Sequence, residues 1–306
     1  MNKFDREYLE KKYGVNNILL REYYHFLGKT YPRNLANILF KRQFNRNINW
    51  ENPKDLNEKI NWLAFKTDTT LWTTLSDKVA VRDYLISKGF EHILPNLYGV
   101  WKSPQTIDFD ILPQKFVIKC NHDSGSVFLI DDKSKVNKED LINAIKENLS
   151  RSFGIITAEP HYKRIKKVIF AEEHIENDNF DFSTLIDYKF WSFNGKVEYC
   201  HVYYTKNTNE RKKSAIYKVS DWSYQKDKML ENQESLEIPP PRTLTEMLHI
   251  ISVLTKDFPQ CRVDLYESNG KVYFGELTFT AGCGRICDYT NDFLLELGNK
   301  ITLPKI

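Results

Sequence analysis

The apolar residues of the N-terminal region recur mainly at helical spacing. Leu56, Ile60 and Leu63 lie three and four positions apart, so they form one face of a helix. Asn52 and Pro53 stand just before them and predict the N-cap and the first helical position. This pattern predicts a helix within a mainly helical first part of the chain.

A second helix is predicted from Leu75 to Lys88. Gly89 follows it, and glycine commonly ends a helix because it adopts the left-handed conformation without strain. The pair Asp77 and Lys78 falls near the start of this predicted helix.

From Phe116 onward the pattern changes to short β-rich runs separated by helices. Three runs predict strands, at Phe116–Cys120, Val127–Ile130 and Val168–Ala171. Between the second and third, Lys138–Arg151 predicts a helix that Asn137 caps.

The second half of the chain is rich in hairpin signals. Asp187–Phe193 and Lys196–Tyr204 flank Asn194-Gly195, a dipeptide typical of two-residue hairpin turns. The prolines 239–241 then break the chain before an amphipathic helix from about Leu244, and a last hairpin follows. Hairpins mixed with helices indicate an α+β fold with largely antiparallel sheet.

Charged residues interrupt both strands of this last hairpin. A three-residue loop at Ser268–Gly270 would pair Glu267 with Lys271 and set Glu276 opposite Arg262 and diagonal to Asp264. Because strand side chains alternate, one face of the hairpin is expected to carry Arg262, Asp264, Glu276 and Thr278.

Two interpretations of this charged face remain open from spacing alone. It is either an exposed cross-strand salt bridge of about 0–1 kcal/mol, or a site for a hard cation such as Mg²⁺, which prefers oxygen ligands.

Other polar stretches follow predicted strands. Lys119 precedes the loop 121–126, where Ser124, Gly125 and Ser126 suit either backbone contacts to a phosphate or a plain β-turn. Adjacent acids at Glu172–Glu173 mark either a solvated strand end or a hinge that meets a nucleoside.

Composition narrows the class of protein. The 306 residues suffice for about two domains, and a net charge of +3 is too small to argue for nucleic acid. No apolar run approaches the roughly 18 residues of a spanning helix, so we expect a cytosolic protein. Five scattered cysteines without a CxxC pair fit reduced thiols.

Basic residues near the N-terminus, such as Lys11 and Lys12, predict a solvated face, with a membrane or polyanion contact as the alternative.

The order of these pieces resembles the ATP-grasp superfamily, and more narrowly the TupA-like ATP-grasp family, from about residue 50 to 298. The motifs that carry the likeness are short but specific in combination: Asn52–Leu63, Asp77–Arg82, Phe116–Gly125, Asp187–Phe190, Arg262–Tyr266 and Gly275–Phe279.

This resemblance implies two α+β subdomains that clasp ATP, with ATP and Mg²⁺ as cofactors. The expected parts are a mainly helical region at 1–115, a lid subdomain at 116–175 and a C-terminal subdomain with the metal-binding hairpin at 176–306. The implied nucleotide-binding residues are Lys78, Lys119, Ser124, Gly125, Ser126, Asp187 and, on the adenine side, Glu172, Glu173, His174 and Ile175.

The same resemblance assigns the metal to Asp264, Glu276 and Thr278. Arg262 is expected to meet the transferring phosphate or an acyl phosphate, and Lys189 to add a phosphate contact. Thr278 stands where many ATP-grasp enzymes have Asn, which leaves open whether one metal or two bind.

The implied activity is that of a carboxylate-amine ligase, which makes an acyl phosphate with release of ADP and then an amide. Members of the family look like parts of bacterial capsule and other surface-polysaccharide pathways, so the expected substrates are a uronic-acid sugar or peptide carboxylate and an amino acid or amine. Enzymes of polysaccharide assembly are possible partners.

Two alternatives belong to other functional classes. Acids around Asp178 and Asp181 suit a glycosyltransferase that binds a sugar nucleotide through a metal. Trp191, Trp222 and Tyr203 suit stacking on sugars in a non-catalytic polymer-binding module.

Overall fold

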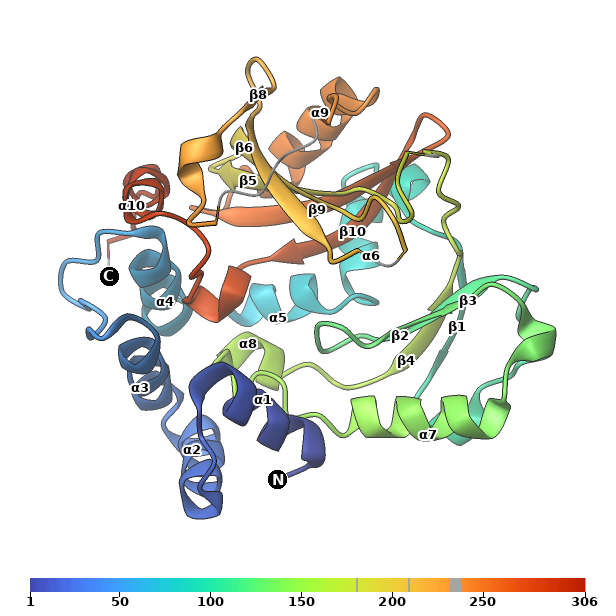
Figure 1. The fold of residues 1–306 in the computed structure, drawn as a ribbon, viewed down its shortest axis with the longest axis horizontal. Helices are drawn as coiled ribbons and strands as arrows, with labels where there is room; N and C mark the ends of the chain where they lie inside the picture. The colour runs from blue at the N-terminus through green and yellow to red at the C-terminus, as the bar shows by residue number, and fades with distance from the viewer. Residues whose placement is uncertain (180, 209, 232–237, 306) are drawn as a thin grey trace. The chain divides into compact units, whose positions relative to one another are not determined.

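The computed structural model describes residues 1–179, 181–208, 210–231 and 238–305. The chain forms two compact units that are each discontinuous in sequence. Unit 1 contains Met1–Ile48, Ala64–Val81 and Pro95–His174, and unit 2 contains Asn49–Leu63, Arg82–Leu94 and Ile175–Ile306. Figure 1 shows the elements of both.

Unit 1 begins with three helices whose ends are fixed by local sequence. Asn2 and Asn17 are N-caps, and Pro32 occupies the first turn of the third helix. The helices of this unit are α1 (Lys3–Tyr13), α2 (Ile18–Thr30), α3 (Pro32–Phe44), α5 (Thr70–Ser76), α7 (Lys138–Leu149) and α8 (Pro160–Lys163).

A four-stranded antiparallel sheet forms the rest of unit 1, in the order β1-β4-β2-β3. Its strands are β1 (Leu97–Trp101), β2 (Phe116–Cys120), β3 (Val127–Ile130) and β4 (Ile169–Glu172). Helix α7 packs on one face, where Phe116, Ile118 and Ile145 are fully buried in a shared core. Figure 1 shows α7 running along this sheet.

Unit 2 is built on a six-stranded antiparallel sheet in the order β10-β9-β5-β6-β7-β8. Its strands are β5 (Asp187–Phe193), β6 (Lys196–Tyr204), β7 (Lys213–Lys218), β8 (Ser223–Tyr224), β9 (Cys261–Ser268) and β10 (Lys271–Thr278). Helix α9 (Leu244–Thr255) buries Met247, Ile251 and Leu254 against β5, β6 and β9. Unit 2 also holds α10 (Asn291–Asn299) and nearly all of α6 (Val81–Ser87), while α4 (Leu56–Lys66) crosses from unit 2 into unit 1.

The strand predictions are confirmed, with the bounds of β2, β3, β5 and β6 as expected. Asn194 and Gly195 have φ values of 49° and 79°, as a two-residue turn with a right-handed strand twist requires. The antiparallel α+β fold class is also confirmed.

Two helix predictions are wrong. The predicted helix at Leu75–Lys88 is two helices, α5 and α6, because the Asp77 side chain accepts hydrogen bonds from the backbone of Val79 and Ala80 and starts α6 afresh.

The cap predicted at Asn52 is also wrong. Asp55 performs that role: its Oδ1 accepts from the Glu58 backbone at 2.9 Å, and the Glu58 carboxylate accepts from the Lys54 backbone at 2.8 Å.

The predicted register of the last hairpin needs correction as well. The turn contains only Asn269 and Gly270, and a bulge at Gly275 shifts the pairing again. A side chain at Gly275 would lie 2.8 Å from the Asp264 carbonyl oxygen, so only glycine fits there. As a result Glu276 lies opposite Asp264, and Thr278 lies opposite Arg262.

Within the described part of the chain, none of the helices combines the length and the apolarity that a membrane span requires.

Candidate active site

The charged residues of the last hairpin meet on one face of the unit 2 sheet. The Arg262 guanidinium binds Asp264 through two contacts of 2.7 Å, one to each carboxylate oxygen. From β5, Lys189 Nζ donates to Asp264 and lies 2.8 Å from Asp187 Oδ2. The predicted common face is therefore confirmed although the predicted register is wrong.

Glu276 and Thr278 complete this charged cluster, which we define as Asp187, Lys189, Arg262, Asp264, Glu276 and Thr278. Arg262 Nη2 lies 3.2 Å from Glu276 Oε1, and Thr278 Oγ1 donates to the same oxygen at 3.0 Å. The Asp264 side chain is only 2% exposed, whereas that of Glu276 is 29% exposed. Glu276 is thus the carboxylate that a ligand reaches most easily.

Burial and charge oppose each other in this cluster. Burial alone would raise the pKa of Asp264, but Arg262 and Lys189 outweigh it and lower that pKa, so the carboxylate stays ionised. Burial likewise opposes the charge on Lys189, but Asp264 and Asp187 raise its pKa. Three carboxylates face two buried cations, and the half-exposed Lys212 lies 3.4 Å from Asp187 at the rim.

The donor set fits a small hard cation. Two carboxylates and a hydroxyl supply oxygens side by side, and Mg²⁺ usually takes one or two carboxylates and fills its shell with water and phosphate. Among the described residues no three His, Cys, Asp or Glu side chains are grouped as a fuller metal cage would need. Both oxygens of Asp264 already contact Arg262 or Lys189, so a bound ion would share this carboxylate with them.

A buried histidine lies next to the cluster on the neighbouring strand, and sequence reasoning missed it. His201 lies opposite Lys189 in the sheet, and its Nδ1 is 2.8 Å from the hydroxyl of Tyr289. Burial first, and then the charges of Arg262 and Lys189, lower the pKa of His201 to about 3. The imidazole is therefore neutral and adds no third cation.

Unit 1 carries a second polar group on its sheet. Lys119 Nζ lies 2.5 Å from Glu172 Oε1, from adjacent strands β2 and β4. The two side chains point away from α7, because Ile118 and Ala171 occupy the core-facing positions between them.

The same sheet face is apolar and open, which the sequence did not reveal. Val127 and Leu129 on β3 are 46% and 64% exposed, and Val100 on β1 is 42% exposed. An apolar surface next to Lys119 and Glu172 suits an aromatic base with polar edges.

The loop after β2 is held firmly at its base and is open at its tip. Asp123 is buried and lies 3.1 Å from Arg151, and Lys78 Nζ donates to the Asp123 carbonyl at 2.5 Å. Ser124 and Gly125 are exposed, whereas Ser126 is buried. Gly125 has φ +86°, and a side chain there would meet no atom within 4 Å, so a ligand can approach its backbone.

The residues expected on the adenine side are bound to different neighbours. Glu173 Oε2 accepts from the backbone and side chain of Asn96 at 3.0 and 2.9 Å, and His174 Nε2 lies 3.1 Å from Asp131. The last segment of unit 1 ends at His174, and the last segment of unit 2 begins at Ile175.

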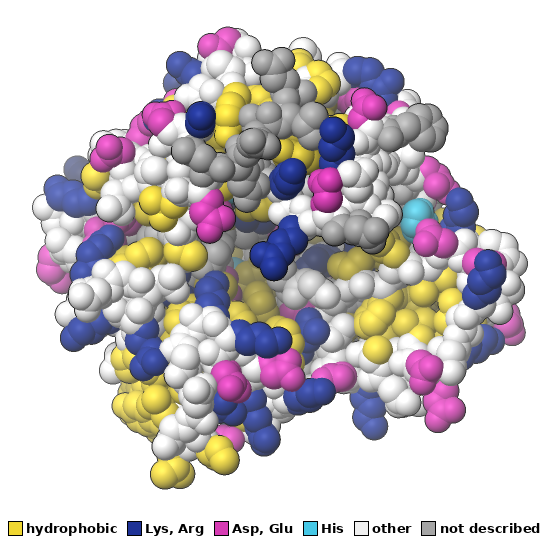
Figure 2. Space-filling model, in the orientation of Figure 1, with side chains coloured by type: hydrophobic (Ala, Val, Ile, Leu, Met, Phe, Trp, Pro, Cys, Tyr) yellow, Lys and Arg dark blue, Asp and Glu magenta, His cyan; other side chains and the backbone are white. Residues whose placement is uncertain are grey.

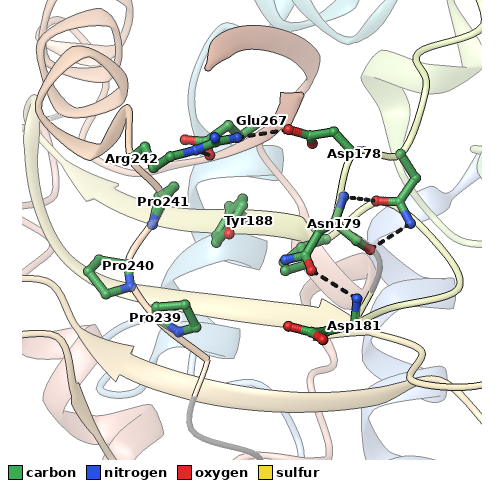
Figure 3. A pocket seen from close by; sticks show the side chains of 11 residues that line it. Asp178, Asn179, Asp181, Tyr188, Pro239, Pro240, Pro241, Arg242 and Glu267 are labelled. Carbon is green, nitrogen blue, oxygen red and sulfur yellow. Dashed lines mark hydrogen bonds and ion pairs between the residues drawn. The ribbon is translucent and has the colours of Figure 1, made fainter. Parts of the chain in front are cut away.

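The acids behind the glycosyltransferase interpretation lie elsewhere in unit 2. Asp178 and Asp181 line a pocket of about 470 Å³ with Tyr188 and the prolines 239–241 (Figure 3). The Asp178 carboxylate binds Arg242 at 2.8 Å, and Arg242 also binds Glu267 at 3.0 Å. Tyr188 points to the opposite face of β5 from Asp187 and Lys189, so this pocket is separate from the charged cluster.

The stacking platform proposed for a sugar-binding module is incomplete. Trp191 is 1% exposed and hydrogen-bonded to Tyr289, so its ring is not available to a sugar. Trp222 is already stacked on Tyr217 at 5.0 Å.

The family model for TupA-like ATP-grasp proteins matches residues 58–302. The chain belongs to the TupA-like ATP-grasp family. The match includes both sheets and every residue of the charged cluster. No curated protein sequence matches the chain.

Several solved ATP-grasp structures are similar to this family member. They include D-alanine–D-alanine ligase from Bacillus anthracis, with 17% identity over 81% of this chain and 69% of that one and a TM-score of 0.40. The corresponding ligase from Helicobacter pylori gives 15% identity over 79% and 62%, with a TM-score of 0.39. The ATP-grasp ligase PsnB, in a complex with Mg and ADP, gives 9% identity over 88% and 66%, with a TM-score of 0.41.

Proposed function

We propose that the protein is an ATP- and Mg²⁺-dependent ligase that joins a carboxylate to an amine through an acyl phosphate. The observation that carries the proposal is the charged cluster on β5, β9 and β10, in a chain of the TupA-like ATP-grasp family. Buried cations next to oxygen ligands suit phosphoryl transfer, in which the protein mainly positions groups and stabilises charge.

The role of each member of the cluster follows from its burial and partners. Asp264, Glu276 and Thr278 would hold Mg²⁺, which supplies positive charge to the transferring phosphoryl group. Arg262 is fixed by Asp264 in a bidentate pair, so its remaining donors are already oriented toward a phosphate or acyl phosphate. Lys189 is fixed between Asp187 and Asp264 and contributes a second, less mobile cation.

Unit 1 would bind the rest of the nucleotide. The backbone at Ser124, Gly125 and Ser126 suits phosphate oxygens, with Lys78 beside the loop and Lys119 on the sheet. The open apolar face around Leu129 suits the adenine ring, with polar groups at its edge from the segment Glu172–Ile175. We retain the division into a helical region at 1–115, a lid at 116–175 and a C-terminal part at 176–306 as part of this proposal.

The proposed reaction has two steps. A carboxylate oxygen of the acid attacks the γ-phosphorus, the bond to the bridging oxygen breaks, and ADP leaves. The amine nitrogen next attacks the acyl carbon, phosphate leaves with the carbon–oxygen electron pair, and the nitrogen loses a proton to give the amide.

The substrates are proposed from the family resemblance. We propose a uronic-acid sugar as the acid and an amino acid or amine as its partner, in bacterial surface-polysaccharide synthesis in the cytoplasm.

The test is the release of ADP and phosphate from ATP with panels of uronic acids and amines. We expect turnover only when acid, amine and Mg²⁺ are all present, and with hydroxylamine in place of the amine we expect a hydroxamate. Release of nucleoside diphosphate from a sugar nucleotide would support glycosyl transfer instead. A rate of ADP release that does not depend on the acid substrate would contradict an acyl phosphate.

A further inference from the structure

Helix α2 exposes a stripe of large hydrophobic side chains. Ile18 is 72% exposed and Leu19 79%, Tyr23 and Phe26 are 50% and 51%, and Tyr31 just beyond the helix is 58% exposed. Leu19, Tyr23 and Phe26 recur at spacings of four and three, so they lie along one face of the helix, and Ile18 adjoins Leu19 at its start. In Figure 2 yellow side chains gather at the lower left, where Figure 1 draws α2.

The opposite face of α2 is already used for packing within unit 1. Tyr24, Leu27 and Gly28 are buried there. A side chain at Gly28 would lie 2.1 Å from the Ile155 carbonyl oxygen, so the helix backbone is in direct contact with that loop. The helix is therefore fixed in rotation and does not turn its outer stripe inward.

The charge of this region is unlike that of the rest of the chain. Residues 1–50 contain ten Lys and Arg but four Asp and Glu, an excess of six, whereas the whole chain has an excess of three. The remaining residues therefore carry a deficit of three. Lys11 and Lys12 lie in the last turn of α1, shortly before α2 begins, and Lys29 lies in the last turn of α2.

The family match begins at residue 58, so the residues that carry the family likeness do not include this region. The helices α1 to α3 all precede that point. A basic region that exposes an apolar helix face has the features of a docking surface.

We propose that α2 docks this protein on an anionic lipid surface. Aliphatic and aromatic side chains on one helix face, with lysines beside them, are the features of helices that lie in the headgroup region of a membrane. The excess of positive charge decides between occupants: it attracts anionic lipid, whereas a second copy would bring the same positive charge against it. This inference is independent of the proposed ligase activity.

The test is co-sedimentation of the full chain with neutral phosphatidylcholine vesicles and with vesicles that also contain phosphatidylglycerol. We expect at least about tenfold stronger binding to the anionic vesicles, weakening as salt is added. The double substitution Leu19→Ser and Phe26→Ser should lower binding by about tenfold or more, because it removes apolar area from the stripe. The matched control, Ile111→Ser with Leu295→Ser, removes side chains that are 56% and 42% exposed elsewhere and should leave binding unchanged.

A second variant tests the electrostatic contribution to vesicle binding and leaves the apolar stripe unchanged. Lys11→Gln with Lys12→Gln should weaken anionic binding at low salt and leave the thermal unfolding midpoint unchanged, since both side chains are exposed. Equal sedimentation with neutral and anionic vesicles, or equal loss in the control variant, would overturn the proposal. So would a stable dimer in light scattering that the α2 variant dissociates, because the stripe would then belong to a second copy.

Discussion

The substitution Glu276→Gln separates the contribution of Glu276 to stability from its contribution to turnover. The change keeps the shape of the side chain and removes one negative charge. Glu276 is 29% exposed and lies 3.2 Å from Arg262, which keeps both of its contacts to Asp264. A part-exposed ion pair of this kind is worth about 0–1 kcal/mol, so the free energy of unfolding should fall by less than about 1 kcal/mol.

The expected effect on turnover is far larger. Loss of a group that stabilises charge in a transition state typically costs about 10²–10³ in rate, and Glu276 is proposed as a direct metal ligand. We therefore expect ADP formation to fall by at least about 10²-fold, with a higher Mg²⁺ concentration needed for half-maximal rate. The measurements are a coupled ADP assay across a Mg²⁺ titration and urea unfolding of the same preparation.

Glu296→Gln provides the matched control. Glu296 lies in the same unit, is 32% exposed and lies 2.8 Å from Lys228, but it is outside the charged cluster. It should show a similar small stability change with normal turnover and Mg²⁺ dependence. If Glu276→Gln retains turnover within about twofold at the wild-type Mg²⁺ requirement, the metal assignment is wrong, since even groups behind a metal ligand usually matter by 10–100-fold.

Three further predictions follow from burial, backbone conformation and charge. Asp264→Asn should destabilise the fold by about 3 kcal/mol, because it leaves buried Lys189 and Arg262 short of a counter-charge; urea unfolding measures this, and a loss below about 0.5 kcal/mol would contradict it. The pKa of Asp264 is lowered from 3.8 in the folded state, so its stabilising contribution is present above that pH and is lost as pH falls through the folded value; unfolding free energy should therefore drop less steeply with acid in Asp264→Asn than in the wild type. Gly125→Ala should cost about 1 kcal/mol through its φ of +86° and raise the KM for ATP, as kinetics with varied ATP would show; an unchanged KM would remove the loop from the nucleotide site.

The sequence predicted the parts of the fold that depend on local signals. The bounds of β2, β3, β5 and β6 follow from apolar runs and from the Asn194-Gly195 turn. The common face of Arg262 and Asp264 also follows from strand alternation, which a change of register by two residues does not disturb.

The errors and omissions have physical causes that sequence spacing does not contain. The bulge at Gly275 arises from a close approach to the neighbouring strand, and a lone glycine does not distinguish it from an ordinary strand position. Asp77 starts a new helix in a stretch where apolar spacing continues, so periodicity alone joined two helices.

Two contacts beside the candidate site join residues that are far apart in the sequence. His201 meets Tyr289 across 88 positions, and Lys78 meets the carbonyl of Asp123 across 45. No local pattern marks either pair. The exposure of β3 was also not predicted, because a short apolar run is equally typical of a buried strand.

The most direct test of the proposed activity follows an oxygen atom. The acid substrate is labelled with heavy oxygen in its carboxylate, and the phosphate released during amide formation is analysed by mass spectrometry. Transfer through an acyl phosphate predicts one labelled oxygen in each phosphate released. Unlabelled phosphate, with the departing carboxylate oxygen found instead in a nucleotide or in water, would contradict an acyl phosphate.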